Sequence, residues 1–139
     1  MKDIRLSSSG RLAVRTAARL ATGFTFALMG WDTFREPGIR VELAADTLAA
    51  MRRVAPLPGD DALVVRANGA VQGVSGALLM LGVLPRLSAL TMATSLVPTT
   101  LAGHSYWQAD DPAFRKQQLI QFCKNISMLG GLLYALAHE

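Results

Sequence analysis

The sequence has few charged residues, few aromatic residues and a single cysteine. Charged side chains make up 17% of its 139 residues and aromatic ones 6%, whereas about a quarter of the residues of a soluble domain are charged. The lone Cys123 excludes an intramolecular disulfide and a CxxC redox centre. Hydrophobic residues, in contrast, reach 51%. This balance favours a membrane protein, and the length predicts a single domain over residues 1–139.

Four apolar stretches are long enough to predict membrane spans. They cover approximately residues 12–31, 63–84, 86–103 and 116–137. Only Pro85 and Arg86 separate the second stretch from the third, and as one helix the two would extend about 60 Å, twice the hydrocarbon thickness. A tight turn must therefore lie between them. The sequence predicts an all-α fold, an antiparallel four-helix transmembrane bundle.

Basic residues gather at the N-terminus and predict how the bundle is oriented. The cluster consists of Lys2, Arg5, Arg11, Arg15 and Arg19. Beside an apolar run, such a cluster is typical of the cytoplasmic end of a span and not of a nucleic-acid interface. Arg86, between the second and third spans, would lie on the same side. We therefore expect a multi-pass protein with both termini in the cytoplasm, the lipid bilayer as partner and no nucleic acid.

The loop between the first and second spans carries a helical pattern of its own. Its apolar residues recur at helical spacing, at Val41, Ala44, Leu48, Met51 and Ala55. Proline–glycine pairs bracket this stretch, and charged residues occupy its other side. The pattern predicts a short interfacial helix in the outer loop that caps the bundle, with a partner-binding surface as the alternative.

Polar side chains that could carry chemistry converge at one end of the predicted bundle. The direction of the spans places six of them at similar depth: Asn68, Gln72, His104, Gln121, Lys124 and Asn125. Because polar groups are costly in hydrocarbon unless they find partners, these side chains should face one another. We expect them to line one small-molecule pocket. The alternative is a fully satisfied hydrogen-bond network without a void. No catalytic residue or metal ligand is predicted.

Three residues at this depth have more than one interpretation. Lys124 is expected to form an ion pair with Asp32, directly or through water, that joins the first and fourth spans; alternatively, Lys124 binds an anionic or carbonyl-bearing ligand. His104 lies beside an aromatic pair, which favours a structural role, with a proton relay as the alternative. Cys123 is expected to be buried and inert.

The ends of the spans carry short motifs. They are Gly30-Trp31-Asp32, Asn68-Gly69, Val97-Pro98-Thr99-Thr100-Leu101-Ala102-Gly103-His104 with Trp107, and Gln121-Phe122-Cys123-Lys124-Asn125 followed by Gly130-Gly131-Leu132-Leu133. Together they resemble the DoxX family of small bacterial membrane proteins over nearly the whole chain. The resemblance implies a location in the bacterial plasma membrane. The family is linked to small subunits of thiosulfate:quinone oxidoreductases and to membrane-associated thiol-redox and oxidative-stress complexes, although many members have no assigned reaction.

The resemblance implies a membrane subunit of a quinone- or thiol-linked redox complex. Quinone carbonyls need hydrogen-bond donors, which the predicted pocket could supply, so a quinone is the candidate cofactor. The sequence carries no haem, flavin, iron–sulfur or metal signature, and electrons would have to come from a protein partner. The chain is thus not expected to be a complete oxidoreductase on its own. The alternative is a non-enzymatic scaffold or a small-molecule binding or transport protein. A homo-oligomer is the alternative to a protein partner.

Overall fold

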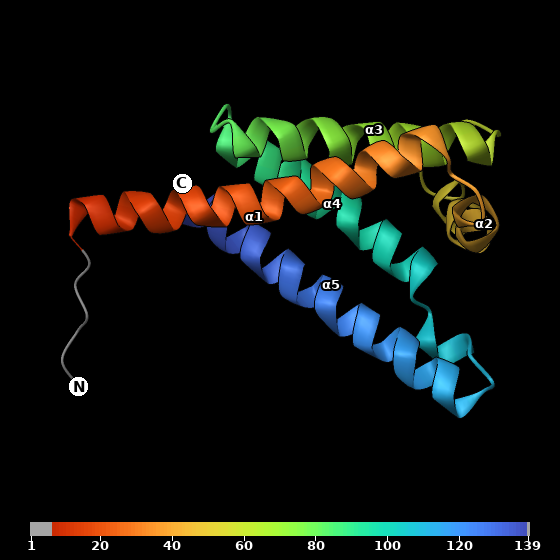
Figure 1. The fold of residues 1–139 in the computed structure, drawn as a ribbon. Coiled ribbons are helices and arrows are strands. Elements are labelled where there is room, and N and C mark those ends of the chain that lie inside the picture. The colour runs from red at the N-terminus through yellow and green to blue at the C-terminus, as the bar shows by residue number, and fades with distance from the viewer. Residues whose placement is uncertain (1–6, 139) are drawn as a thin grey trace.

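The computed structural model describes residues 7–138, and this part of the chain is all-helical with no strand (Figure 1). Its elements are α1 (Ser8–Arg35), α2 (Arg40–Met51), α3 (Asp61–Met80), α4 (Pro85–Gly103), the 3-10 turn η1 (Tyr106–Gln108) and α5 (Pro112–His138). The predicted all-α class is confirmed, and α1, α3, α4 and α5 overlap the four predicted spans. Among the described helices, α3 and α5 are long and apolar enough to cross a membrane. Lys2 and Arg5 lie outside the described residues.

Glycines set the close antiparallel packing of α1 against α3, which lie side by side in Figure 1. A methyl group built at Gly76 would lie 2.5 Å from Ala27 N and 2.6 Å from Gly23 O. One built at Gly69 would lie 2.8 Å from Gly30 O. Since no side chain fits between the two backbones, only glycine allows this approach, as in other membrane helix pairs with small residues at their interface.

The turn between α3 and α4 is as tight as the sequence requires. Gly82 has φ +69° and Leu84 has φ +47°, both in the left-handed region. Pro85 then occupies the first turn of α4, where its missing N–H costs nothing. The predicted reversal is confirmed, although α3 ends at Met80, earlier than the predicted residue 84.

A buried apolar layer fills the middle of the molecule. It consists of Phe26, Leu79, Ala89, Met92, Ala93, Leu96 and Leu132, drawn from α1, α3, α4 and α5. From this layer α5 runs along α4 and diverges from α1 toward its own N-terminus (Figure 1). The end of the molecule where α2 lies, together with the N-termini of α3 and α5, is called the α2 end below. The turn between α3 and α4 and the C-terminus of α5 form the opposite end.

Candidate ligand-binding cavity

A cavity of about 610 Å3 lies at the α2 end, and all five α-helices contribute to its lining. Its volume falls within the range of about 300–1,000 Å3 that is typical of small-molecule sites. Apolar side chains from every wall face it, among them Phe26, Leu48, Leu96 and Met128. The exposed residues Met29 and Lys124 also belong to the lining. The cavity is therefore accessible between α1 and α5, where these helices diverge.

Helix α2 closes one side of this cavity. Ala44 and Leu48 are buried against Val65 of α3, and Val41 and Met51 pack against the same cluster. The predicted short helix in this loop and its apolar face are thus confirmed from Val41 to Met51. Ala55, the last residue of the predicted pattern, follows the helix.

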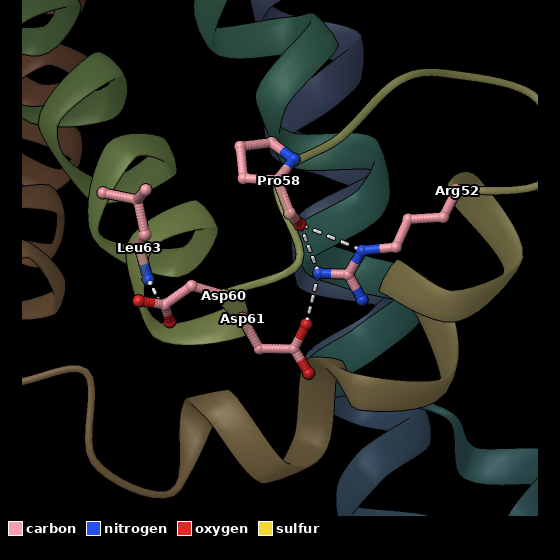
Figure 2. A network of polar contacts seen from close by, with 5 residues as sticks. All are labelled: Arg52, Pro58, Asp60, Asp61 and Leu63. Atoms are coloured by element: carbon pink, nitrogen blue, oxygen red, sulfur yellow. Dashed lines mark hydrogen bonds and ion pairs between the residues drawn. The ribbon is translucent and has the colours of Figure 1, made fainter.

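Arginine contacts hold α2 in place at both of its ends. Arg52 Nη2 lies 2.5 Å from Asp61 Oδ1, and Nη2 and Nε both donate to the carbonyl oxygen of Pro58 (Figure 2). Beside this pair, the Asp60 carboxylate caps α3 by accepting the backbone N–H of Leu63 at 3.1 Å. At the start of α2, Arg40 donates to the carbonyl of Glu36 at 3.1 Å. These bonds fix α2, which is called the lid of the cavity below, to the ends of α1 and α3.

The polar wall of the cavity is an amide–hydroxyl network between α3 and α4. Thr99 Oγ1 donates to the Ser95 carbonyl at 2.9 Å, so it accepts from Asn68 Nδ2 at 3.0 Å and from Gln72 Nε2 at 3.1 Å. Gln72 Nε2 also donates to Ser95 Oγ at 2.9 Å, and Ser95 Oγ donates to Asn68 Oδ1 at 2.6 Å. Both N–H groups of Gln72 are therefore used within the wall. Its Oε1 has no hydrogen-bond donor among residues 7–138 and remains an acceptor.

Helix α5 supplies further polar groups opposite this wall. Asn125 Nδ2 donates to Thr100 Oγ1 at 3.0 Å, and Thr100 in turn donates to the Leu96 carbonyl at 2.7 Å. Gln121 and Lys124 line the cavity, and neither side chain has a hydrogen-bond or ion-pair partner within the part of the chain that the structure describes. Their donors are available to a molecule in the cavity.

His104 combines a structural position with access to the cavity. Its backbone N–H closes α4 on the Thr100 carbonyl at 3.0 Å, and its Nδ1 lies 2.9 Å from Gln118 Oε1. Tyr106 of η1 packs edge-on against Phe122 of α5, with ring centroids 5.4 Å apart. The His104 ring lines the cavity. When Nδ1 carries the proton and donates it to Gln118 Oε1, Nε2 is the hydrogen-bond acceptor of the ring.

The structure brings all six predicted polar residues to the lining of this one cavity. Two expectations about their neighbours need correction. The predicted direct ion pair between Asp32 and Lys124 is absent from the described residues, because the Asp32 carboxylate lies 2.7 Å from Arg40 Nη2 instead. Cys123 is exposed and not buried, because it lies on the face of α5 opposite Gln121 and Asn125, which line the cavity.

Sequence reasoning also missed several residues that build the site. Ser95 and Thr99 of α4 orient the side-chain amides of Asn68 and Gln72. Arg40 forms the ion pair with Asp32 that was predicted for Lys124. The spacing of Ser95 and Thr99, one helical turn apart, was a signal that could have found them. Within residues 7–138, no three His, Cys, Asp or Glu side chains gather closely enough to hold a metal ion.

Comparison with known proteins adds one finding. A family model described as DoxX matches residues 14–105, which cover α2, α3 and α4 completely and α1 from Val14 onward. No match was found among curated proteins or among solved structures. The matched region contains the amide–hydroxyl wall, the lid and His104. Helix α5, with the motif around Lys124, lies outside it.

Proposed function

The chain belongs to the DoxX family of membrane proteins, and on that premise we propose that it is the membrane subunit of a quinone- or thiol-linked redox complex. In this proposal the cavity at the α2 end binds a quinone or a closely related small molecule. The observation that carries the proposal is the cavity itself, which joins an amide–hydroxyl wall to apolar walls in one space.

The proposed arrangement in the membrane has α1, α3, α4 and α5 as four spans. Helices α1, with 28 residues, and α4, with 19 residues, are about 42 and 28 Å long, compared with about 30 Å of hydrocarbon. Large apolar side chains such as Phe24 of α1 and Leu90 of α4 are exposed on the outside of the protein, as lipid-facing residues are. The termini are proposed to be cytoplasmic because Arg15, Arg19 and Arg86 share the end opposite α2.

The hydrogen-bonding groups that remain available suit a quinone head group. Gln72 offers a carbonyl acceptor, while Gln121 and Lys124 offer donors. A quinone presents carbonyl acceptors, and its reduced form presents hydroxyl donors, so both forms can be satisfied at such a site. Phe26 and Leu96 would then contact the ring or its apolar tail.

Electrons and protons have separate sources in this proposal. A quinone supplies the redox chemistry when it is bound, and a partner protein exchanges electrons with it. The exposed surface of α5 is the candidate contact for that partner or for a second copy of the chain, because Leu132 is the only buried residue of this helix. His104 is the proposed group for proton exchange.

The rival function, passage of a small molecule through the bundle, has less support. The buried layer that contains Met92 and Leu132, at 0% and 1% exposed, closes the inner end of the cavity. This favours a binding site over a path across the protein. A scaffold without a ligand is the outcome if nothing binds in the cavity.

The test uses two matched pairs on α5 in the purified full-length protein. Lys124→Met and Gln121→Leu remove donors at the cavity, while Lys116→Met and Gln117→Leu make the same changes at exposed positions outside its lining. Titration with a short-chain benzoquinone should give affinities about tenfold weaker for each cavity variant, the cost of roughly one hydrogen bond. The controls should match the wild type. Absence of binding, or equal affinity in all five proteins, would contradict the proposal.

A further inference from the structure

A second cavity, of about 280 Å3, lies at the end opposite α2, between α1, α3 and α5. Leu79 of α3 and Leu132 of α5, 2% and 1% exposed, form its buried side. Val14, Ala18 and Thr22 line it from α1. We call it the small cavity and the cavity at the α2 end the large cavity. The two linings have no residue in common.

The two cavities follow one another along α1 and α5. On α1, Thr25 lines the large cavity and Thr22 lines the small one. On α5, Met128 lines the large cavity and Gly131 lines the small one. Residues three apart on a helix share a face and lie about 4.5 Å apart along its axis. Both helices therefore pass directly from one lining to the other, and we call the space between them the seam.

One apolar layer lies beneath both cavities. Phe26 and Leu96 of this layer line the large cavity. Leu79 and Leu132 of the same layer line the small cavity. The layer closes the way through the bundle, but it leaves the way along the seam open, because α1 and α5 make little contact with each other. A flexible apolar chain can thus follow the seam over the outer side of this layer.

The far end of the seam is closed by a contact between the two helices. Arg15 Nη2 donates to the carbonyl oxygen of His138 at 2.6 Å, which ties α1 to the end of α5. Arg19 also lines the small cavity, and its Nη1 lies 3.0 Å from the position of a methyl group built at Gly82, so its head group is at the turn after α3. The aliphatic stems of such side chains pack against hydrocarbon. The seam is therefore a blind groove that begins at the large cavity.

We propose that the seam holds the apolar tail of a ligand whose head group occupies the large cavity. The inference rests on the proposed function and names its substrate class, which is a lipid-soluble quinone with a long tail. The tail must be long enough to follow the seam from Thr25 to Ala18, about 10 Å by the helical rise. It would cover Leu132 from the lipid side, while the head group keeps the hydrogen-bonding groups of the large cavity.

Two pairs of neighbouring residues provide matched variants, one pair on each helix. Gly131 lines the small cavity, and a methyl group built there meets no atom within 4 Å. Gly130 has equally open surroundings but does not belong to the lining. On α1, Ala18 lines the small cavity, whereas the exposed Ala17 does not. Gly131→Leu and Ala18→Leu are the filling variants, and Gly130→Leu and Ala17→Leu are their controls.

The experiment locates the tail by photolabelling of the full-length protein in phosphatidylcholine nanodiscs. The probe is a benzoquinone with a ten-carbon tail that ends in a diazirine, and mass spectrometry identifies the labelled residues. In the wild type and both controls we expect labels on residues 14–22 and 131–138, and an excess of decyl benzoquinone should remove them. Each filling variant should carry at least tenfold less label at these positions, because its new side chain occupies the seam.

Two labelling results would overturn the proposal. One is labelling of the seam that neither filling variant reduces. The other is labelling spread over lipid-facing residues such as Leu90 of α4 that excess decyl benzoquinone does not reduce, since the probe would then be dissolved in the bilayer. If one filling variant does not fold, the pair on the other helix decides.

Titration of the same proteins with a short-chain benzoquinone separates this inference from the proposed function. Its affinity should be equal in the wild type and in all four variants, which also shows that each variant is folded. Normal short-chain binding without labelling of the seam would overturn the tail site alone. Absence of short-chain binding by the wild type would overturn the proposed function and the tail site with it.

Discussion

The two ends of this protein place their polar groups in different ways. At the α2 end, neutral amides and hydroxyls satisfy one another in pairs, as Gln72 does with Thr99 at 3.1 Å, beside a cavity of about 610 Å3. At the opposite end, the exposed side chain of Arg15 donates to the backbone carbonyl of His138 at 2.6 Å, beside a cavity of about 280 Å3.

This difference separates the chemistry that each end can recognise. Neutral donors and acceptors at fixed positions discriminate between uncharged ligands by hydrogen-bond pattern, whereas the formal charges of arginines act over a longer distance and depend less on orientation. The apolar layer around Met92 lies between them. The two ends should therefore respond independently to substitution, except at the helix contact on which both depend.

The largest loss of stability is expected at the contact between α1 and α3, which holds both ends of the protein together. Gly76→Leu would drive a side chain into Ala27 N, 2.5 Å from the position of the new Cβ. Backbone atoms cannot move aside as a side chain can, so we expect a loss of about 3 kcal/mol or more in the free energy of unfolding. Thermal unfolding in detergent measures it. Gly130→Leu is the control, and equal stability of the two variants would show that the close helix contact is not needed.

The next effect separates the two ends. Gln72→Leu removes two hydrogen bonds from the wall, including the one that Ser95 Oγ accepts, at a cost of about 1–3 kcal/mol. We expect this variant to bind benzoquinone about tenfold more weakly than the wild type in the same titration. Gly131→Leu, which changes the lining of the cavity at the opposite end, should bind benzoquinone as the wild type does. Weaker binding by both variants would mean that the two ends are coupled.

Some of this architecture follows from the sequence by simple physical limits. The hydrocarbon thickness forces the reversal at Gly82 and Pro85, and it occurs there. The periodicity from Val41 to Met51 marks the buried face of α2 correctly. The direction of the chain in each predicted span also fixes the depth of the polar residues. This is why six polar side chains from α3, α5 and the end of α4 line one cavity.

Other features depend on the tilt between helices, which cannot be predicted from the periodicity of apolar residues. Helix α5 diverges from α1 (Figure 1), so Lys124 forms no ion pair with Asp32 among the described residues. Arg40, the first residue of α2, forms the ion pair with that carboxylate instead. The cavity at the opposite end was not predicted for the same reason, because its lining forms only where the end of α5 lies beside α1.

A smaller effect is expected at the lid of the α2 end. Arg52→Met removes the 2.5 Å contact with Asp61 and the bonds to Pro58 (Figure 2). The two side chains are 27% and 28% exposed, so the charge-assisted bonds are partly shielded from water and should contribute about 1–2 kcal/mol. Hydrogen exchange should show faster opening of α2 with little change in α5. Unchanged exchange in α2 would mean that its apolar face alone holds the lid.

The smallest effect distinguishes the two possible partners of Asp32. The Asp32–Arg40 pair is 52% and 42% exposed, and exposed pairs contribute only about 0.2–1 kcal/mol. A double-mutant cycle of Asp32→Asn with Arg40→Met should therefore give a coupling free energy of about 0.5 kcal/mol. The cycle of Asp32→Asn with Lys124→Met should be additive within error, because Lys124 faces the cavity and not the carboxylate. Coupling to Lys124 that exceeded the coupling to Arg40 would show that α5 closes against α1 in the membrane, which would narrow the cavity at the α2 end and remove the contrast between the two ends.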